Sequence, residues 1–117
     1  MRLTMILLAL TYNVSHADFK PAIPMPSKVL DEQTTLTRIA LGSCFDQRRS
    51  DKIFAKVQEA EPDAFLFIGD NVYASDESDD PQLMSLKRAY RQLANSNRFA
   101  SLREDIPVLT IWDDHDY

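Results

Sequence analysis

The segment 64–68 constrains the fold most, because all five of its residues, Ala-Phe-Leu-Phe-Ile, are apolar. A half-exposed strand alternates apolar and polar residues, whereas a strand of a parallel sheet that is covered on both faces is apolar throughout. Two further largely apolar runs, 38–41 and 108–112, lie on either side of it in the sequence. We therefore predict three strands, with 64–68 in the interior of the sheet.

The intervals between these runs carry helical periodicity, because their apolar residues recur every three or four positions. Strand, helix, strand, helix and strand in this order predict an α/β fold with a parallel βαβαβ sheet. The residues that support the helices are Ile53, Phe54 and Val57 in the first, Leu83, Leu86, Tyr90 and Leu93 in the second, and Phe99 and Leu102 in a further turn or two.

Polar residues follow each predicted strand at its carboxyl end. These segments are Gly42-Ser43-Cys44, Gly69-Asp70-Asn71 and Asp113-Asp114-His115-Asp116. Parallel strands place their carboxyl ends at one edge of the sheet, where open α/β folds bind ligands. The chain has only two glycines, and both stand directly before this chemistry, where the lack of a Cβ permits a sharp turn and close approach of a ligand.

Each of these residues also has a purely structural interpretation, which the sequence leaves open. Cys44 fits a small buried apolar residue, Asp70 fits a turn and Tyr73 fits a packing aromatic. The carboxylates around His115 fit a solvated loop. We assign the acidic residues within 76–80 to a solvated loop without a metal role.

A thiol, carboxylates and an imidazole at one edge form a set of metal ligands, and a carboxylate can bridge two cations. Such a pair suits phosphoester hydrolysis, because it binds phosphoryl oxygens and lowers the pKa of a bridging water. Asp70 would bridge, and His115 would stabilise phosphoryl charge or protonate the leaving alkoxide. The alternatives are a Ser43 or Cys44 nucleophile with His115 as base, and a secreted metal-binding module without turnover.

The start of the chain has the pattern of an export signal. Arg2, the apolar run 3–10 and the small residue Ala17 predict a secretory signal peptide over 1–17, and hence a secreted or periplasmic protein. The apolar run is too short for a membrane anchor, which needs about 20 residues. The proline-containing segment 18–37 is expected to be a linker or lead-in. A net charge of −5 argues against a nucleic-acid partner.

The three strand-end motifs resemble those of the PhoD-like alkaline phosphatase/phosphodiesterase family. They are Gly42–Cys44, Pro62–Ala74 and Trp112–Tyr117. The resemblance covers 38–117, which we expect to be the N-terminal part of a catalytic domain longer than this chain, and we expect these residues alone to be inactive. It implies that the βαβαβ unit is the N-terminal half of a four-layer αββα metallophosphatase fold, and that the substrate is a phosphoester.

The resemblance also implies cofactors and site roles. Some members of the family use iron with calcium. Cys44 and Tyr73 would ligate iron, and Asp70 would be the bridging aspartate. Asp114 and His115 match the metal-ligand and catalytic pair of the third motif.

Overall fold

The computed structural model describes residues 23–75 and 81–116 of the 117-residue chain. The predicted signal peptide and the acidic run at 76–80 lie outside these residues. The described chain is α/β, as predicted. In chain order its elements are β1 (Ile39–Gly42), α1 (Lys52–Glu59), β2 (Ala64–Ile68), α2 (Met84–Ala94), α3 (Asn97–Asp105), β3 (Val108–Ile111) and the 3-10 helix η1 (Asp114–Asp116).

The three strands form one parallel sheet in the order β1-β2-β3. This order confirms that the fully apolar strand β2 is interior. The register pairs Gly42 with Phe67 and Phe67 with Thr110, so the three strands end at nearly the same level. The loops that carry the predicted site residues therefore leave the sheet side by side.

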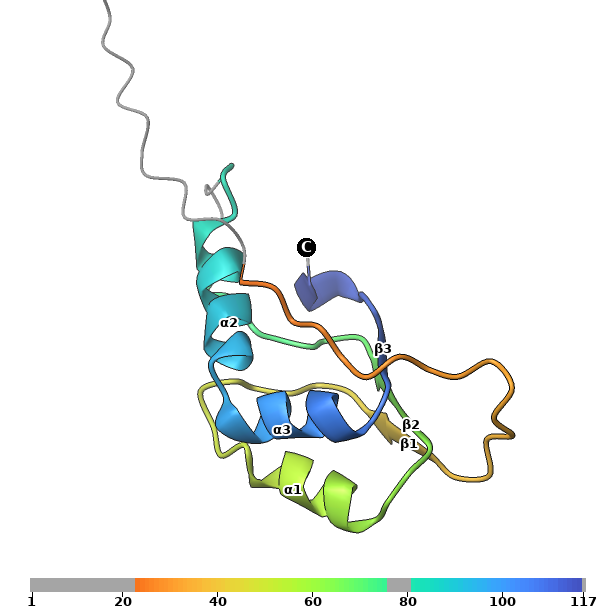
Figure 1. Cartoon of the computed structure of the whole chain (residues 1–117). Helices are drawn as coiled ribbons and strands as arrows, with labels where there is room; N and C mark the ends of the chain where they lie inside the picture. The colour runs from red at the N-terminus through yellow and green to blue at the C-terminus, as the bar shows by residue number, and fades with distance from the viewer. Residues whose placement is uncertain (1–22, 76–80, 117) are drawn as a thin grey trace, which may run out of the picture.

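All three helices lie on the same side of the sheet (Figure 1). Both crossovers move one strand further in the same direction, and right-handed crossovers then place their helices on one common face. The core between this face and the helices is rich in aromatic rings, and the ring of Phe54 lies 4.7 Å from Phe45 and 4.8 Å from Phe99. Each such ring contributes roughly 1.5–3 kcal/mol by leaving water.

The opposite face of the sheet is apolar and largely exposed, although Ala64 on this face is 1% exposed. Its side chains alternate with the core-facing ones along each strand, and every one of the following is at least 43% exposed: Ile39, Leu41, Ile68, Leu109 and Ile111. The prediction that β2 is covered on both faces therefore holds at Ala64 and is wrong at Ile68 among the described residues. An all-apolar strand is suited to a sheet that has a packed layer on each face. In the described residues, helices pack on only one face.

Predicted boundaries shift by one residue in three elements, beginning with β1, which is predicted at 38–41 and spans Ile39–Gly42. The second helix starts at Met84 because Leu83 has a left-handed backbone, with φ at 53°, which no α-helix accommodates. The last strand ends at Ile111, before Trp112. The segment around Phe99 and Leu102 is a full helix, α3, which is longer than the further turn or two predicted.

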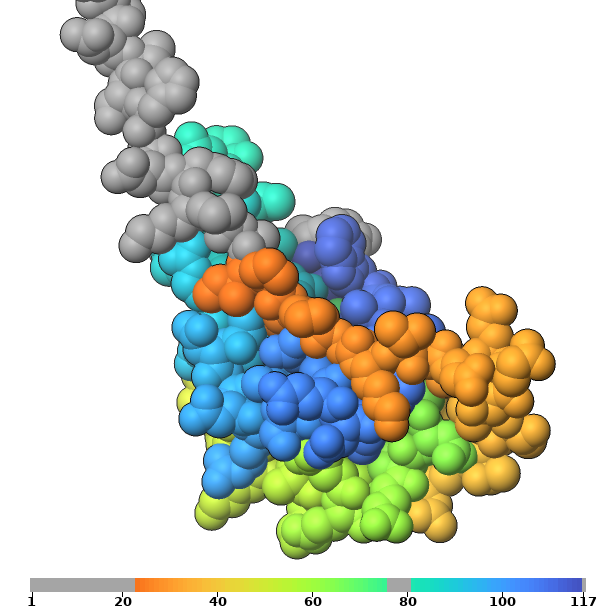
Figure 2. Space-filling view, viewed as in Figure 1, coloured from red at the N-terminus to blue at the C-terminus, as the bar shows by residue number. Residues whose placement is uncertain are grey.

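The lead-in segment crosses α3 and β3 on the surface before β1 begins (Figure 2). The N–H of Lys28 donates to the carbonyl of Arg103 at 2.7 Å, and the buried guanidinium of Arg103 donates to the carbonyl of Pro26 at 2.7 Å. Burial lowers the pKa of Arg103. These contacts fix residues 26–28 against α3. No helix within the described residues is long and apolar enough to cross a membrane.

Candidate metal centre

The structure brings the predicted site residues together at the carboxyl edge of the sheet. Cys44 follows β1, Asp70 follows β2, and Asp114 and His115 lie in η1 after β3. Asp70, Asp114 and His115 each offer one ligand atom, and these atoms all lie within 4.8 Å of one another. This spacing is short enough for one cation to contact all three side chains.

The remaining two predicted ligands contact the same carboxylate. Cys44 Sγ lies 3.6 Å from Oδ2 of Asp70, and the hydroxyl of Tyr73 donates to that oxygen at 2.9 Å. Cys44 is exposed, which excludes the buried apolar role for its thiol. The ring of Tyr73 also lies 4.7 Å from the ring of His115. Asp70 is thus the centre of the cluster.

Two of the cluster residues have strained backbones. Cys44 and Asp70 adopt left-handed conformations, with φ at 55° and 49°. A non-glycine residue pays roughly 1–2 kcal/mol for this conformation. The strain is held by hydrogen bonds between the two loops, because the N–H of Phe45 donates to the carbonyl of Asp70 at 3.0 Å and that of Cys44 donates to the carbonyl of Gly69 at 3.4 Å.

The two glycines have different reasons to lack a Cβ. Gly69 has φ at 98°, and a Cβ there would lie 2.7 Å from the Cβ of Asp113, so this glycine allows the loop after β3 to approach the loop after β2. At Gly42 an added Cβ would lie 2.7 Å from the ring of Phe65. The prediction of a turn that needs glycine thus holds for Gly69, whereas Gly42 accommodates a core aromatic.

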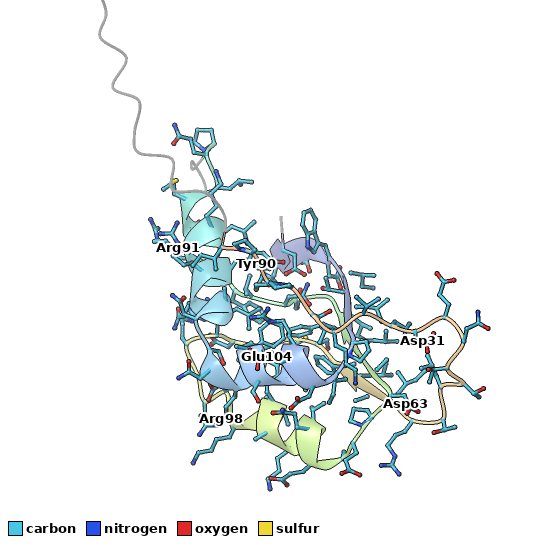
Figure 3. The ribbon with its side chains drawn as sticks, in the orientation of Figure 1. Asp31, Asp63, Tyr90, Arg91, Arg98 and Glu104 are labelled. Carbon is cyan, nitrogen blue, oxygen red and sulfur yellow. The ribbon has the colours of Figure 1, made fainter. Side chains whose placement is uncertain are left out.

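Asp116 has a role that the sequence did not indicate. Its carboxylate is 1% exposed and joins the loops after β2 and β3. It accepts hydrogen bonds from the N–H of Asn71 at 2.9 Å, from the side-chain amide of Asn71 at 3.2 Å and from the N–H of Asp113 at 3.0 Å. Tyr90 extends from α2 and donates its hydroxyl at 2.8 Å (Figure 3). Burial, and then this bond, raise the pKa of Tyr90.

Gln47 is a second residue that sequence reasoning missed. Its side-chain amide donates to the carbonyl of Tyr73 at 2.8 Å and accepts from the N–H of Tyr73 at 2.9 Å. The side chain of Gln92 in α2 in turn donates to the carbonyl of Gln47 at 3.0 Å. This reciprocal pair fixes the backbone of Tyr73 beside Asp70. A glutamine three residues after a strand-end cysteine gives no sequence signal of its own.

The cluster has an unsatisfied buried oxygen, which is what a cation site requires. Oδ1 of Asp70 is buried and has no hydrogen-bond partner, and such an atom costs about 1–3 kcal/mol. The hydrogen bonds that the Tyr73 hydroxyl makes to Cys44 and to Asp70 raise the pKa of Tyr73. The carboxylates suit calcium, and a thiolate with a phenolate suits ferric iron. The residues present therefore fit the metals that the resemblance implies.

The hydrogen bonds around Ser43 and Cys44 do not support the alternative in which one of these residues is a nucleophile activated by His115. Ser43 Oγ lies 3.5 Å from Cys44 Sγ, and that thiol points to Asp70. Among the hydrogen bonds of the described residues, neither Ser43 nor Cys44 is linked to His115. A base that activates a nucleophile stands within hydrogen-bond reach of it.

Comparisons with known proteins found no relative of this chain. The chain matches no protein-family model, and no similar curated protein or solved structure is found.

Proposed function

We propose that this chain carries the metal centre of a metal-dependent phosphoester hydrolase of the PhoD-like alkaline phosphatase/phosphodiesterase type. The observation that carries the proposal is the meeting of Asp70, Asp114 and His115, from two different strand ends, with their ligand atoms within 4.8 Å. The orphaned Oδ1 of Asp70 supports it independently, because a buried carboxylate oxygen without a donor is stabilised by a cation.

Each of the site residues has a role that follows from the chemistry of its side chain. Asp70 is the bridging carboxylate, Asp114 is a carboxylate ligand, and Cys44 and Tyr73 are the ligands suited to ferric iron. His115 donates a proton to the leaving oxygen or stabilises charge on the phosphoryl group. Bound iron and calcium would supply Lewis acidity toward the phosphoryl oxygens and lower the pKa of water.

The fold that accompanies this function has four layers. The support is the largely exposed apolar sheet face formed by β1, β2 and β3, because a contiguous apolar patch on a sheet is a surface that packs against another layer. We propose that a second sheet packs on this face, which yields the αββα arrangement that the motifs imply. The predicted signal peptide supports the proposal that the hydrolase acts outside the cytoplasm.

Metal analysis and turnover together test the function. The chain is dialysed against Fe³⁺ and Ca²⁺, and its metal content is measured by mass spectrometry. Hydrolysis of 4-nitrophenyl phosphate and of bis(4-nitrophenyl) phosphate is followed in the complete four-layer domain that we propose. Asp70→Ala is expected to lose bound metal and turnover. The matched control Asp31→Ala, which removes an exposed carboxylate whose hydrogen bonds stay within its own turn, is expected to retain both.

Other outcomes identify the alternatives. Turnover that survives removal of metal by EDTA supports a covalent nucleophile at Ser43 or Cys44. Metal binding without turnover of either substrate supports the metal-binding module. Unchanged metal content in Asp70→Ala contradicts the bridging role.

A further inference from the structure

A pocket of about 540 Å³ lies beside the candidate metal centre. It is lined by the loop after β1, by Ile53 of α1 and by Tyr73. Cys44 and Tyr73 line this pocket and also contact Oδ2 of Asp70, so the pocket and the metal centre share a wall. Ligand pockets in proteins occupy about 300–1,000 Å³, and this one is therefore large enough for a small organic group.

Three charged side chains line the pocket, namely two guanidinium groups and one carboxylate. Arg48 pairs with both carboxylate oxygens of Asp46, at 2.8 and 3.0 Å, and Nε of Arg49 lies 3.4 Å from the same carboxylate. The hydrogen bond from Arg48 is the largest cause that lowers the pKa of Asp46 to about 2, so the carboxylate is ionised at neutral pH. Asp46 therefore contacts both guanidinium groups, and its two oxygens are held by Arg48.

Arg49 is the guanidinium that is best placed to meet a ligand. Its side chain is 84% exposed, and a guanidinium carries five N–H donors, of which Asp46 engages Nε. Apolar surface lies in the same pocket, because Phe45 and the half-exposed Ile53 also line it. A pocket with both features suits an organic group that has a negative charge of its own.

We propose that this pocket holds the leaving group of the phosphoester, and that Arg49 gives preference to a leaving group that carries its own negative charge. The inference rests on the proposed phosphoester hydrolysis. In that reaction the oxygen of water forms a bond to phosphorus while the bond from phosphorus to the leaving oxygen breaks. The leaving oxygen keeps the electron pair and takes up a proton, so a separated alcohol or phenol occupies the pocket.

Two substrates that differ by one charge test the preference. The metal-loaded complete four-layer domain is assayed with phenyl phosphate and with 4-carboxyphenyl phosphate, and released inorganic phosphate gives kcat/KM for each. We expect the carboxylated substrate to be favoured by up to about fivefold, the size of one exposed charge pair. Arg49→Gln is expected to bring the ratio close to one. The control Lys28→Gln removes an exposed positive charge outside the pocket and is expected to keep the ratio.

Equilibrium binding separates a failure of this inference from a failure of the proposed function. Both compounds are titrated calorimetrically into the chain and into Arg49→Gln, which requires no turnover. If neither compound is hydrolysed, the proposed function fails, and the affinity ratio still decides whether the pocket selects the carboxylate. Equal affinity and equal kcat/KM for the two compounds in the unaltered chain, or a preference that Arg49→Gln retains, overturns the inference.

Discussion

Replacement of Asp116 by alanine is the perturbation for which the structure predicts the largest local effect. The change removes a carboxylate that is 1% exposed and leaves four donors without their acceptor: the N–H groups of Asn71 and Asp113, the side-chain amide of Asn71 and the hydroxyl of Tyr90. An unsatisfied buried donor costs about 1–3 kcal/mol. Because water can enter the space and serve some of them, we expect a loss of about 3–5 kcal/mol in the free energy of unfolding.

Urea unfolding measures this loss, with Asp116→Asn and Asp31→Ala beside it. Asp116→Asn keeps one acceptor oxygen and is expected to lose less, about 1–2 kcal/mol, because half of the donors retain a partner. Asp31→Ala removes an exposed carboxylate and is expected to change stability by less than about 0.5 kcal/mol. A loss below about 1 kcal/mol for Asp116→Ala refutes the conclusion that this carboxylate joins the two loops.

Two further predictions concern the loop after β2 and the acid stability of the fold. Gly69→Ala is expected to lower the free energy of unfolding by more than about 2 kcal/mol, because it adds left-handed strain and a 2.7 Å approach to the Cβ of Asp113. The same change should weaken metal binding in equilibrium dialysis. Unchanged metal affinity contradicts this prediction. Hydrogen bonds from Ser96 and then Arg98 lower the pKa of Asp51 from its ordinary value of 3.8, so its stabilisation is present above that pH and is lost as the pH falls through the lower folded value. Asp51→Asn should therefore flatten the fall in stability measured by urea unfolding below about pH 4, and an unaltered pH profile counts against this role.

The elements of the fold were predictable from local patterns, because each pattern fixes the periodicity of one segment. The apolar run in β2 is sufficient to predict that this strand lies in the interior of the sheet. The same run cannot say whether a second layer is present, so it overstated the cover on Ile68. The left-handed backbone of Leu83 has no signature in a leucine, and the helix start was therefore placed one residue early.

The ligand cluster was predictable for a topological reason. Residues that directly follow parallel strands must meet at one edge, which is why Cys44, Asp70 and His115 could be named from the sequence. The supporting residues were not predictable in the same way. Asp116 stands among three other polar residues, and only its burial against Tyr90 separates it from them.

X-ray absorption at the iron edge of the iron-loaded chain tests the central claim most directly, since it reports the atoms that surround the metal. If the strand ends share one metal centre, the spectrum contains one sulfur neighbour at about 2.3 Å together with oxygen neighbours near 2.0–2.2 Å. The sulfur is lost in Cys44→Ser, oxygen neighbours are lost in Asp70→Ala, and both are retained in His115→Ala, which removes the proposed acid and no ligand. A spectrum with oxygen neighbours alone, unchanged by Cys44→Ser and by Asp70→Ala, contradicts the claim.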